Sequence, residues 1–253
     1  MTYHGRTFSL GWSMPVASIQ LLGDFVVRTA DGPVDLGRGA QRLLALLALR
    51  RHPQPRTAVA HALWPEASAS RGVIRLAQAI RQLPEQLRGG VLVDADGRIG
   101  LDPMWTIDLD DALDAARRIH AGGPPVDLDL IVFRLDLLPG WFDRWLVDVQ
   151  ERYRRLRLSV LTRLARHHLA GGDAHTVVGI ARELVEEDPL REDYQHLLVA
   201  GLARAGDPVE ALEQYHRFRA RLRLEWGAAP SGELVAAVSR TLHPSAAGRL
   251  LTG

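Results

Sequence analysis

Three Asp-x-Asp pairs and one His-His pair are the residues of this sequence whose spacing could bind a metal ion. They are Asp94/Asp96, Asp108/Asp110, Asp127/Asp129 and His167/His168. Carboxylate oxygens suit Mg²⁺ and Ca²⁺, but each aspartate pair lies at an expected turn or helix start, where Asp is common for its backbone hydrogen bonds. Neighbouring residues on a helix point about 100° apart, so the two histidines do not readily share one ion. We therefore expect no metal site.

The motifs of the common catalytic sites are missing from the sequence. The chain has no Cys and no Lys, which excludes disulfides, a cysteine nucleophile and the lysine of a Gly-x-x-x-x-Gly-Lys phosphate loop. It contains neither a Gly-x-Ser-x-Gly elbow nor a His-Glu-x-x-His motif. We expect a protein that is not an enzyme and needs no cofactor.

A cluster of Arg and Gln between residues 71 and 82 has the chemistry of DNA recognition. Apolar residues recur there at helical spacing, and the opposite face carries Arg71, Arg75, Gln78, Arg81 and Gln82. An α-helix fits the major groove, where Arg can pair with guanine and Gln with adenine. The alternative interpretation is that these residues form only the solvated face of an amphipathic helix.

The segments around this cluster follow the order of a winged helix-turn-helix. Strands are expected at 19–28 and 33–36, helices at 40–49, 58–63 and from Ser68 or Ser70 to Pro84, and a hairpin at 91–101. The hairpin places Arg98 at the tip of a wing. Thr57 is the expected N-cap of the middle helix, and Arg42 or Thr57 is expected to position DNA phosphates.

The charge is divided unevenly along the chain. Residues 1–106 hold 12 Arg and 8 acidic residues, whereas residues 107–253 hold 19 Arg and 22 acidic residues. The basic excess of the first part suits an anionic partner, although a solvated surface gives a similar count. Apolar runs such as Leu43–Leu49 are too short to span a bilayer. We expect a cytoplasmic protein that does not bind membranes.

The second part of the chain has helical periodicity and an internal repeat. A helix is expected at 108–120 and a linker at 122–125. Gly172-Asp173 recurs 34 positions later as Gly206-Asp207, and this is the period of tetratricopeptide repeats. The predicted fold is an α+β winged helix-turn-helix followed by an all-α, TPR-like repeat domain. We expect a leader at 1–18, a DNA-binding domain at 19–106 and a helical domain at 107–253.

An aromatic cluster follows the turn at Pro139-Gly140. Trp141, Phe142 and Trp145 are expected to pack between the two domains, because buried aromatic residues dominate such interfaces. A ligand cage is the alternative interpretation.

Motifs from Ile19 to Leu242 resemble the SARP activators, the antibiotic regulatory proteins of actinobacteria. The matching segments are Ile19–Phe25, Gln41–Leu49, Ala62–Pro65, Leu138–Trp141, Asp188–Glu192, Ala211–Tyr215 and Gly227–Ser231. The resemblance implies an OmpR-like winged helix followed by a bacterial transcriptional activator domain. It also implies activation of secondary-metabolite genes. The protomers are expected to bind direct repeats of promoter DNA as a homodimer and to contact RNA polymerase holoenzyme.

The helix after Ser70 departs from the pattern of that family. The family usually has Asn and Arg where this chain has Arg75 and Ala77, and basic residues where it has Gln82 and Pro84. Two hypotheses follow. In the first, this chain is a sequence-specific activator with altered specificity. In the second, it is a protein-interaction adaptor that uses its helical repeats and has lost specific DNA recognition.

Overall fold

The computed structural model describes residues 17–242, and these residues divide into two compact units. The N-terminal unit contains residues 17–114 and 135–153, and the helical unit contains residues 115–134 and 154–242. The expected domains, 19–106 and 107–253, are each continuous in sequence. In the structure, residues 135–153 belong to the N-terminal unit although they follow part of the helical unit in the chain. Most of the expected leader, residues 1–16, lies outside the described residues.

A four-stranded sheet opens the N-terminal unit. Its strands are β1 (Ser18–Gln20), β2 (Val26–Thr29), β3 (Gly32–Val34) and β7 (Thr106–Ile107), in the order β3-β2-β1-β7. The neighbours β1, β2 and β3 pair antiparallel, and β7 pairs parallel with β1. The run expected as one strand at 19–28 is therefore two strands. It breaks at Leu21 and Leu22, whose backbone N–H groups donate to the Asp108 carboxylate at 2.8 and 3.0 Å.

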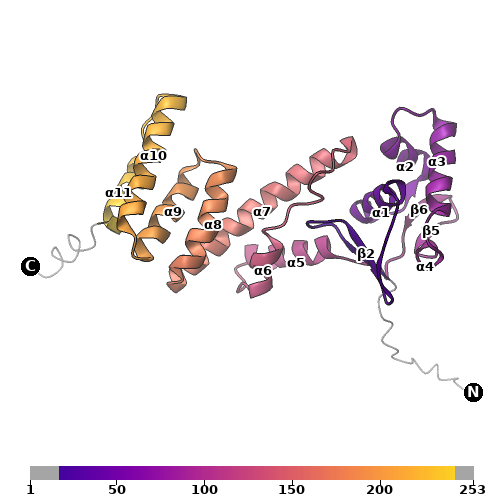
Figure 1. Cartoon of the computed structure of the whole chain (residues 1–253), viewed down its shortest axis with the longest axis horizontal. Coiled ribbons are helices and arrows are strands. Elements are labelled where there is room, and N and C mark those ends of the chain that lie inside the picture. Colours follow the sequence, from indigo (N-terminus) through magenta and orange to yellow (C-terminus); the bar gives the residue numbers. More distant parts are fainter. Residues whose placement is uncertain (1–16, 243–253) are drawn as a thin grey trace, which may run out of the picture. The chain divides into compact units, whose positions relative to one another are not determined.

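Four helices follow the first three strands (Figure 1). They are α1 (Arg38–Arg50), α2 (Arg56–Leu63), α3 (Ala69–Arg81) and the short α4 (Glu85–Arg88). The leucines of α1 form the centre of the core, since Leu43 and Leu44 are fully buried. Thr57 is not the N-cap that we expected, because α2 begins at Arg56, two residues before the expected start, and Pro55 occupies the N-cap position.

The wing is a small sheet with three strands. The expected hairpin forms as β5 (Val91–Val93) and β6 (Arg98–Leu101), and β4 (Gln54–Pro55) adds to the other edge of β6. In the turn, the Asp94 carboxylate accepts from the backbone N–H groups of Asp96 and Arg98. Gly97 follows with φ +71°, a conformation that glycine adopts without strain.

Helices α5 (Asp108–His120) and α7 (Arg144–Gly171) each contribute to both units, and α6 (Asp127–Val132) lies between them in sequence. The segment before α7 joins the N-terminal unit through backbone hydrogen bonds. The Gly23 N–H donates to the Asp136 carbonyl and the Leu138 N–H donates to the Leu21 carbonyl, both at 2.8 Å. At 28 residues α7 is the longest helix, and no helix within residues 17–242 combines the length and apolarity needed to span a membrane.

The helical unit continues with α8 (Ala174–Glu187), α9 (Glu192–Arg204), α10 (Pro208–Trp226) and α11 (Gly232–Leu242). Consecutive helices pack side by side, as Figure 1 shows. The 34-residue repeat is a structural repeat. Gly172 and Gly206 both have positive φ, 84° and 92°, and the aspartate after each one caps the next helix through a backbone N–H. Buried residues also correspond, because Leu184 and Phe218, at equivalent positions, are 0 and 2% exposed.

Candidate nucleic-acid interface

The helix-turn-helix is held in place by close packing between α2 and α3. Gly72 lies so close to α2 that a Cβ atom built on it would meet the Cβ of Ala60 at 3.3 Å. Leu76 and Ala79 continue the buried side of α3, at 1 and 3% exposure. Because three residues at helical spacing face inward, the direction of the opposite face is fixed.

The five residues expected to read DNA from α3 share one exposed face. Arg71, Arg75, Gln78, Arg81 and Gln82 are all exposed. Within the described residues, no side-chain hydrogen bond or ion pair engages Arg71, Gln78, Arg81 or Gln82, and so their donors are available to a ligand. The structure therefore brings together the polar cluster that the sequence predicted, on a helix with the length and position of a recognition helix.

Arg75 differs from its neighbours because it already has an acidic partner. Its Nη1 donates to Glu66 Oε1 at 2.7 Å, across the turn that joins α2 to α3. The pKa of the Glu66 carboxyl is lowered, first by a hydrogen bond from its own backbone and then by Arg75. Both side chains are exposed, at 49 and 66%. An exposed ion pair is weak enough for a DNA phosphate or base to displace it.

Two further predicted contacts lie outside α3, on the wing and on α2. Arg98 starts β6 and is exposed, and its Nε donates to the carbonyl of Pro53 at 3.2 Å. Thr57 is exposed in the first turn of α2 and lines a shallow cavity together with Ser68 and Ala69 at the start of α3. This cavity is lined by residues of α2, of the turn after it and of the start of α3.

Arg42 has a structural position that the sequence did not indicate. Its Nε donates to Asp143 Oδ1 and its Nη2 to the carbonyl of Leu63, both at 2.6 Å, and its side chain is only 22% exposed. The guanidinium thus fixes the end of α2 and the segment before α7. This arrangement leaves Arg42 poorly placed to contact a phosphate.

The three aromatic residues after Pro139 have different surroundings. Trp141 is buried in the N-terminal unit, where its ring lies 5.4 Å from that of Phe25 and 3.8 Å from the Arg38 guanidinium. Phe142 is 91% exposed, so it is not the buried residue that we expected. Trp145 is half-buried, and its indole N–H has no hydrogen-bond partner among residues 17–242.

The Asp-x-Asp pairs have structural partners instead of a metal geometry. Asp110 pairs with Arg51, and Asp129 accepts from Arg118 at 2.7 Å and from the backbone N–H of Val126 at 2.8 Å. In the part of the chain that the structure describes, no group of three or more His, Asp or Glu side chains is arranged to hold a metal ion.

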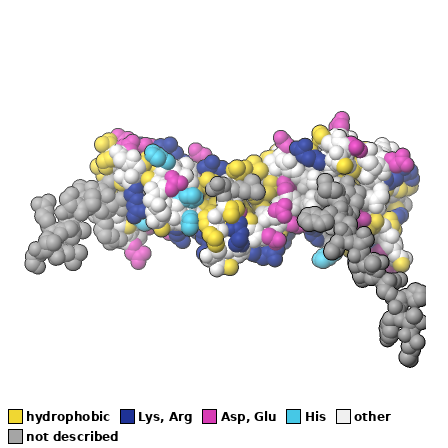
Figure 2. Space-filling view, turned by 90° about the horizontal axis from the view of Figure 1, so that it is seen from below, with side chains coloured by type: hydrophobic (Ala, Val, Ile, Leu, Met, Phe, Trp, Pro, Cys, Tyr) yellow, Lys and Arg dark blue, Asp and Glu magenta, His cyan; other side chains and the backbone are white. Residues whose placement is uncertain are grey.

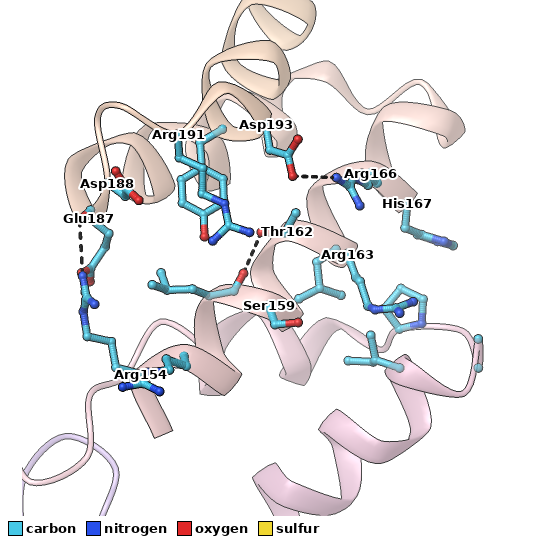
Figure 3. Close-up of a pocket in the computed structure, with 18 residues that line it drawn as sticks. Arg154, Ser159, Thr162, Arg163, Arg166, His167, Glu187, Asp188, Arg191 and Asp193 are labelled. Carbon is cyan, nitrogen blue, oxygen red and sulfur yellow. Dashed lines mark hydrogen bonds and ion pairs between the residues drawn. The ribbon is translucent and has the colours of Figure 1, made fainter. Parts of the chain in front are cut away.

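A polar groove of about 880 Å³ lies in the helical unit. One side is a face of α7, and the other is the junction of α8 and α9 (Figure 3). Glu187 is held by Arg154 and Arg157, and Asp193 pairs with Arg166 at 3.3 Å. The labelled groove residues from these elements are Arg154, Ser159, Thr162, Arg163, Arg166, His167, Glu187, Asp188, Arg191 and Asp193.

Two arginines of this groove lack an acidic partner among the described residues. Arg163 has no ion pair, and the Arg191 guanidinium lies over the ring of Tyr194 at 4.7 Å from its centroid. On the face in Figure 2, arginine and acidic side chains are interspersed over the surface. The groove therefore offers two cationic groups to a ligand. No pattern in the sequence indicates this groove, because its lining comes from three separate segments, 119–125, 154–167 and 187–194.

The family model described as the bacterial transcriptional activator domain matches residues 111–242, just over half of the chain. The chain belongs to this family. It is also similar to the transcriptional regulator RedD of Streptomyces coelicolor, with 37% identity over 83 residues. That match covers 32% of this chain and 23% of RedD, less than a quarter of that regulator's length.

The fold matches that of a solved structure. Mycobacterium tuberculosis EmbR, in complex with a low-affinity phosphopeptide, matches with a TM-score of 0.68 at 20% identity, over 93% of this chain and 70% of that one. The predicted architecture, a winged helix-turn-helix followed by a TPR-like helical domain, is thereby confirmed. The resemblance to SARP regulators is confirmed as well.

Proposed function

We propose that this SARP-family regulator is a sequence-specific DNA-binding activator that reads its operator with α3. Arg71, Arg75, Gln78 and Arg81 would contact base edges in the major groove, and Gln82 would contact the adjacent backbone. The observation that carries the proposal is the exposed face of α3, on which four of the five predicted side chains have no partner within the described residues. Arg and Gln donors at this spacing match the acceptors on guanine and adenine.

The wing and α2 would supply contacts to the DNA backbone. Arg98 lies on the wing and Thr57 in the first turn of α2, and both are exposed. Each phosphate that an arginine neutralises should add about 0.9 to the slope of log affinity against log salt. Arg42 has a different role in this proposal, because its contacts to Asp143 and Leu63 position the helix-turn-helix.

The activator domain suggests the wider role. From the family membership we infer action at promoters. The protomers would bind direct repeats of double-stranded DNA as a homodimer and would contact RNA polymerase holoenzyme. The similarity to RedD supports transcriptional regulation, and the resemblance to antibiotic regulatory proteins supports a secondary-metabolite gene cluster as the target.

The test is a pair of matched double variants of the full chain. A random double-stranded DNA library selects the preferred site, and fluorescence anisotropy then measures affinity for that site and for a scrambled one. Arg75→Ala/Arg81→Ala should lose the preference for the selected site, since each bidentate base contact provides about 1–3 kcal/mol of discrimination. Arg219→Ala/Arg223→Ala, which removes two exposed arginines of α10, should retain it. Equal discrimination by both variants would contradict the assignment.

A second candidate function is favoured by the groove of the helical unit. In this alternative, the chain is an adaptor that binds a protein partner in the groove and no longer recognises a specific DNA sequence. Arg163 and Arg191, which have no acidic partner among the described residues, would bind acidic side chains of that partner. The departures from the family pattern at Ala77 in α3 and at Pro84 just after it also agree with this alternative.

The adaptor function predicts a distinct pair of results. The full chain should have no selective DNA affinity even at low salt, and a protein partner recovered with the full chain should be lost on the double charge reversal Arg163→Glu/Arg191→Glu. The same reversal at Arg219 and Arg223 should leave that partner bound. Selective DNA binding that survives reversal of the groove arginines would instead favour the activator.

A further inference from the structure

An exposed isoleucine lies in the middle of the polar face of α3. Ile74 is 63% exposed, and it stands three residues after Arg71 and four before Gln78, so the three residues form one stripe along the helix. Leu76, two residues further along α3, is 1% exposed in the core. The inward face is fixed by the approach of Gly72 to Ala60. Ile74 therefore faces outward because of its position on the helix.

Its surroundings make Ile74 suited to contact with a ligand. Single exposed aliphatic residues are common on protein surfaces and need no special explanation. Here, however, the flanking positions of the stripe are the donors Arg71 and Gln78, which have no partners within the described residues. A β-branched side chain is stiff at χ1, so its methyl groups hold one position with little loss of entropy on binding.

We propose that Ile74 recognises a thymine in the operator through contact with the 5-methyl group. This inference rests on the proposed function, DNA reading by α3. In the major groove the thymine methyl is the apolar feature that distinguishes the base from cytosine, and aliphatic side chains are its usual partners. Because Ile74 lies between Arg71 and Gln78, its thymine lies between the bases that those residues contact. The operator thus has a thymine within this short stretch, and its recognition depends on one methyl group.

The experiment removes the two methyl-bearing groups separately and together. With the full chain and the operator selected from a random library, each thymine is replaced in turn by deoxyuridine, which lacks only the methyl group. At one position the wild-type protein should lose about fourfold in affinity, the effect of one buried methyl. Ile74→Ala should lose at least as much on the unmodified operator and should be insensitive to deoxyuridine at that position. 5-Methylcytosine placed in a cytosine-substituted operator should restore part of the affinity for wild type alone.

Ile131→Ala is the matched control. Ile131 lies on α6 and is 62% exposed, so its replacement removes the same exposed side chain from a different surface. This variant should keep the wild-type response to deoxyuridine. The inference is overturned if no thymine position responds in the wild-type protein, or if Ile74→Ala keeps the wild-type response. A chain that selects no DNA sequence at low salt would overturn the proposed function together with this inference. Selective binding without a methyl effect would leave the proposed function standing and reject the role of Ile74.

Discussion

Arg75 and Glu66 form an ion pair across the turn of the helix-turn-helix, with 2.7 Å between Nη1 and Oε1. The pair connects one of the proposed base-reading residues to the loop that precedes its own helix. DNA must therefore compete with Glu66 for this guanidinium, while the neighbouring Arg71 and Arg81 have no such competitor in the described structure. The acid also adds a negative charge close to the surface on which a DNA backbone would lie.

Replacing Glu66 should strengthen DNA binding. Glu66→Gln removes the competing charge and frees Arg75, so we expect the affinity for DNA to rise about two- to fivefold at low salt, with a smaller gain at high salt because exposed ion pairs are screened. Fluorescence anisotropy across a salt series measures the change. Glu213→Gln is the control, since Glu213 forms a comparable exposed pair with Arg217 on α10 and should leave DNA affinity unchanged. A weaker complex with Glu66→Gln would show that the carboxylate orients Arg75 for binding.

Removing Arg42 should destabilise the N-terminal unit. Arg42→Ala leaves the Leu63 carbonyl without its donor, and the Asp143 carboxylate keeps only Arg38, whose Nη2 lies 3.8 Å away. The Asp143 side chain is only 9% exposed, and the loss of both hydrogen bonds from Arg42 should cost about 2–3 kcal/mol. Urea denaturation measures the loss. Arg50→Ala, an exposed arginine in the last turn of the same helix, should cost less than about 0.5 kcal/mol. Weaker DNA binding by Arg42→Ala at unchanged stability would identify a phosphate contact instead.

The aspartate of the second repeat turn should be replaceable by asparagine but not by alanine. Asp207 accepts from the backbone N–H of Glu210 at 2.9 Å and caps α10. Asn accepts the same hydrogen bond, whereas Ala cannot, so Asp207→Ala should cost about 1 kcal/mol and Asp207→Asn much less. Thermal unfolding followed by circular dichroism compares the two variants. If both variants lose the same stability, the capping hydrogen bond is not what this position contributes.

Asp108 should make stability depend on pH in the acid range. Burial raises the pKa of its carboxyl above 3.8, and the hydrogen bonds from Leu22 and Leu21 oppose that rise only in part. A raised folded-state pKa gives stability that is fully present below the unfolded value and is lost as pH rises through the folded value. The advantage of the wild type over Asp108→Asn should therefore shrink as pH rises from about 3.8 through the folded pKa and stay constant above it. Urea unfolding of both proteins at several pH values measures it, and an advantage that grows over this window would contradict the assignment.

Local patterns in the sequence predicted most of the helices and the face of α3. The apolar residues of α3 recur at helical spacing, and Gly72, Leu76 and Ala79 are buried on that side. The repeated Gly-Asp turn was equally visible, because positive φ at glycine and capping by aspartate depend on neighbouring residues alone. These features depend on residues that are close together in the sequence, and so the sequence predicts them.

Contacts between distant segments could not be predicted in the same way. Arg42 and Asp143 are 101 residues apart, and the bridge between Leu22 and Leu137 joins the first strand region to the segment before α7. Neither pairing leaves a periodic signal in the sequence. The strands β4 and β7 are two residues long, too short for an alternating pattern, and exist because a partner strand is present. The return of residues 135–153 to the N-terminal unit follows from such pairings.

Sequence-specific DNA binding by α3 is best tested through the salt dependence of DNA binding by the full chain. The preferred site and a scrambled duplex are titrated by fluorescence anisotropy from low to high salt. A reader of specific sequence should bind the preferred site more tightly at every salt concentration, with log affinity falling by about 0.9 per log unit of salt for each phosphate contacted. Equal affinity for both duplexes, or no binding at the lowest salt, would rule out sequence-specific recognition by α3 and favour the adaptor function of the helical unit.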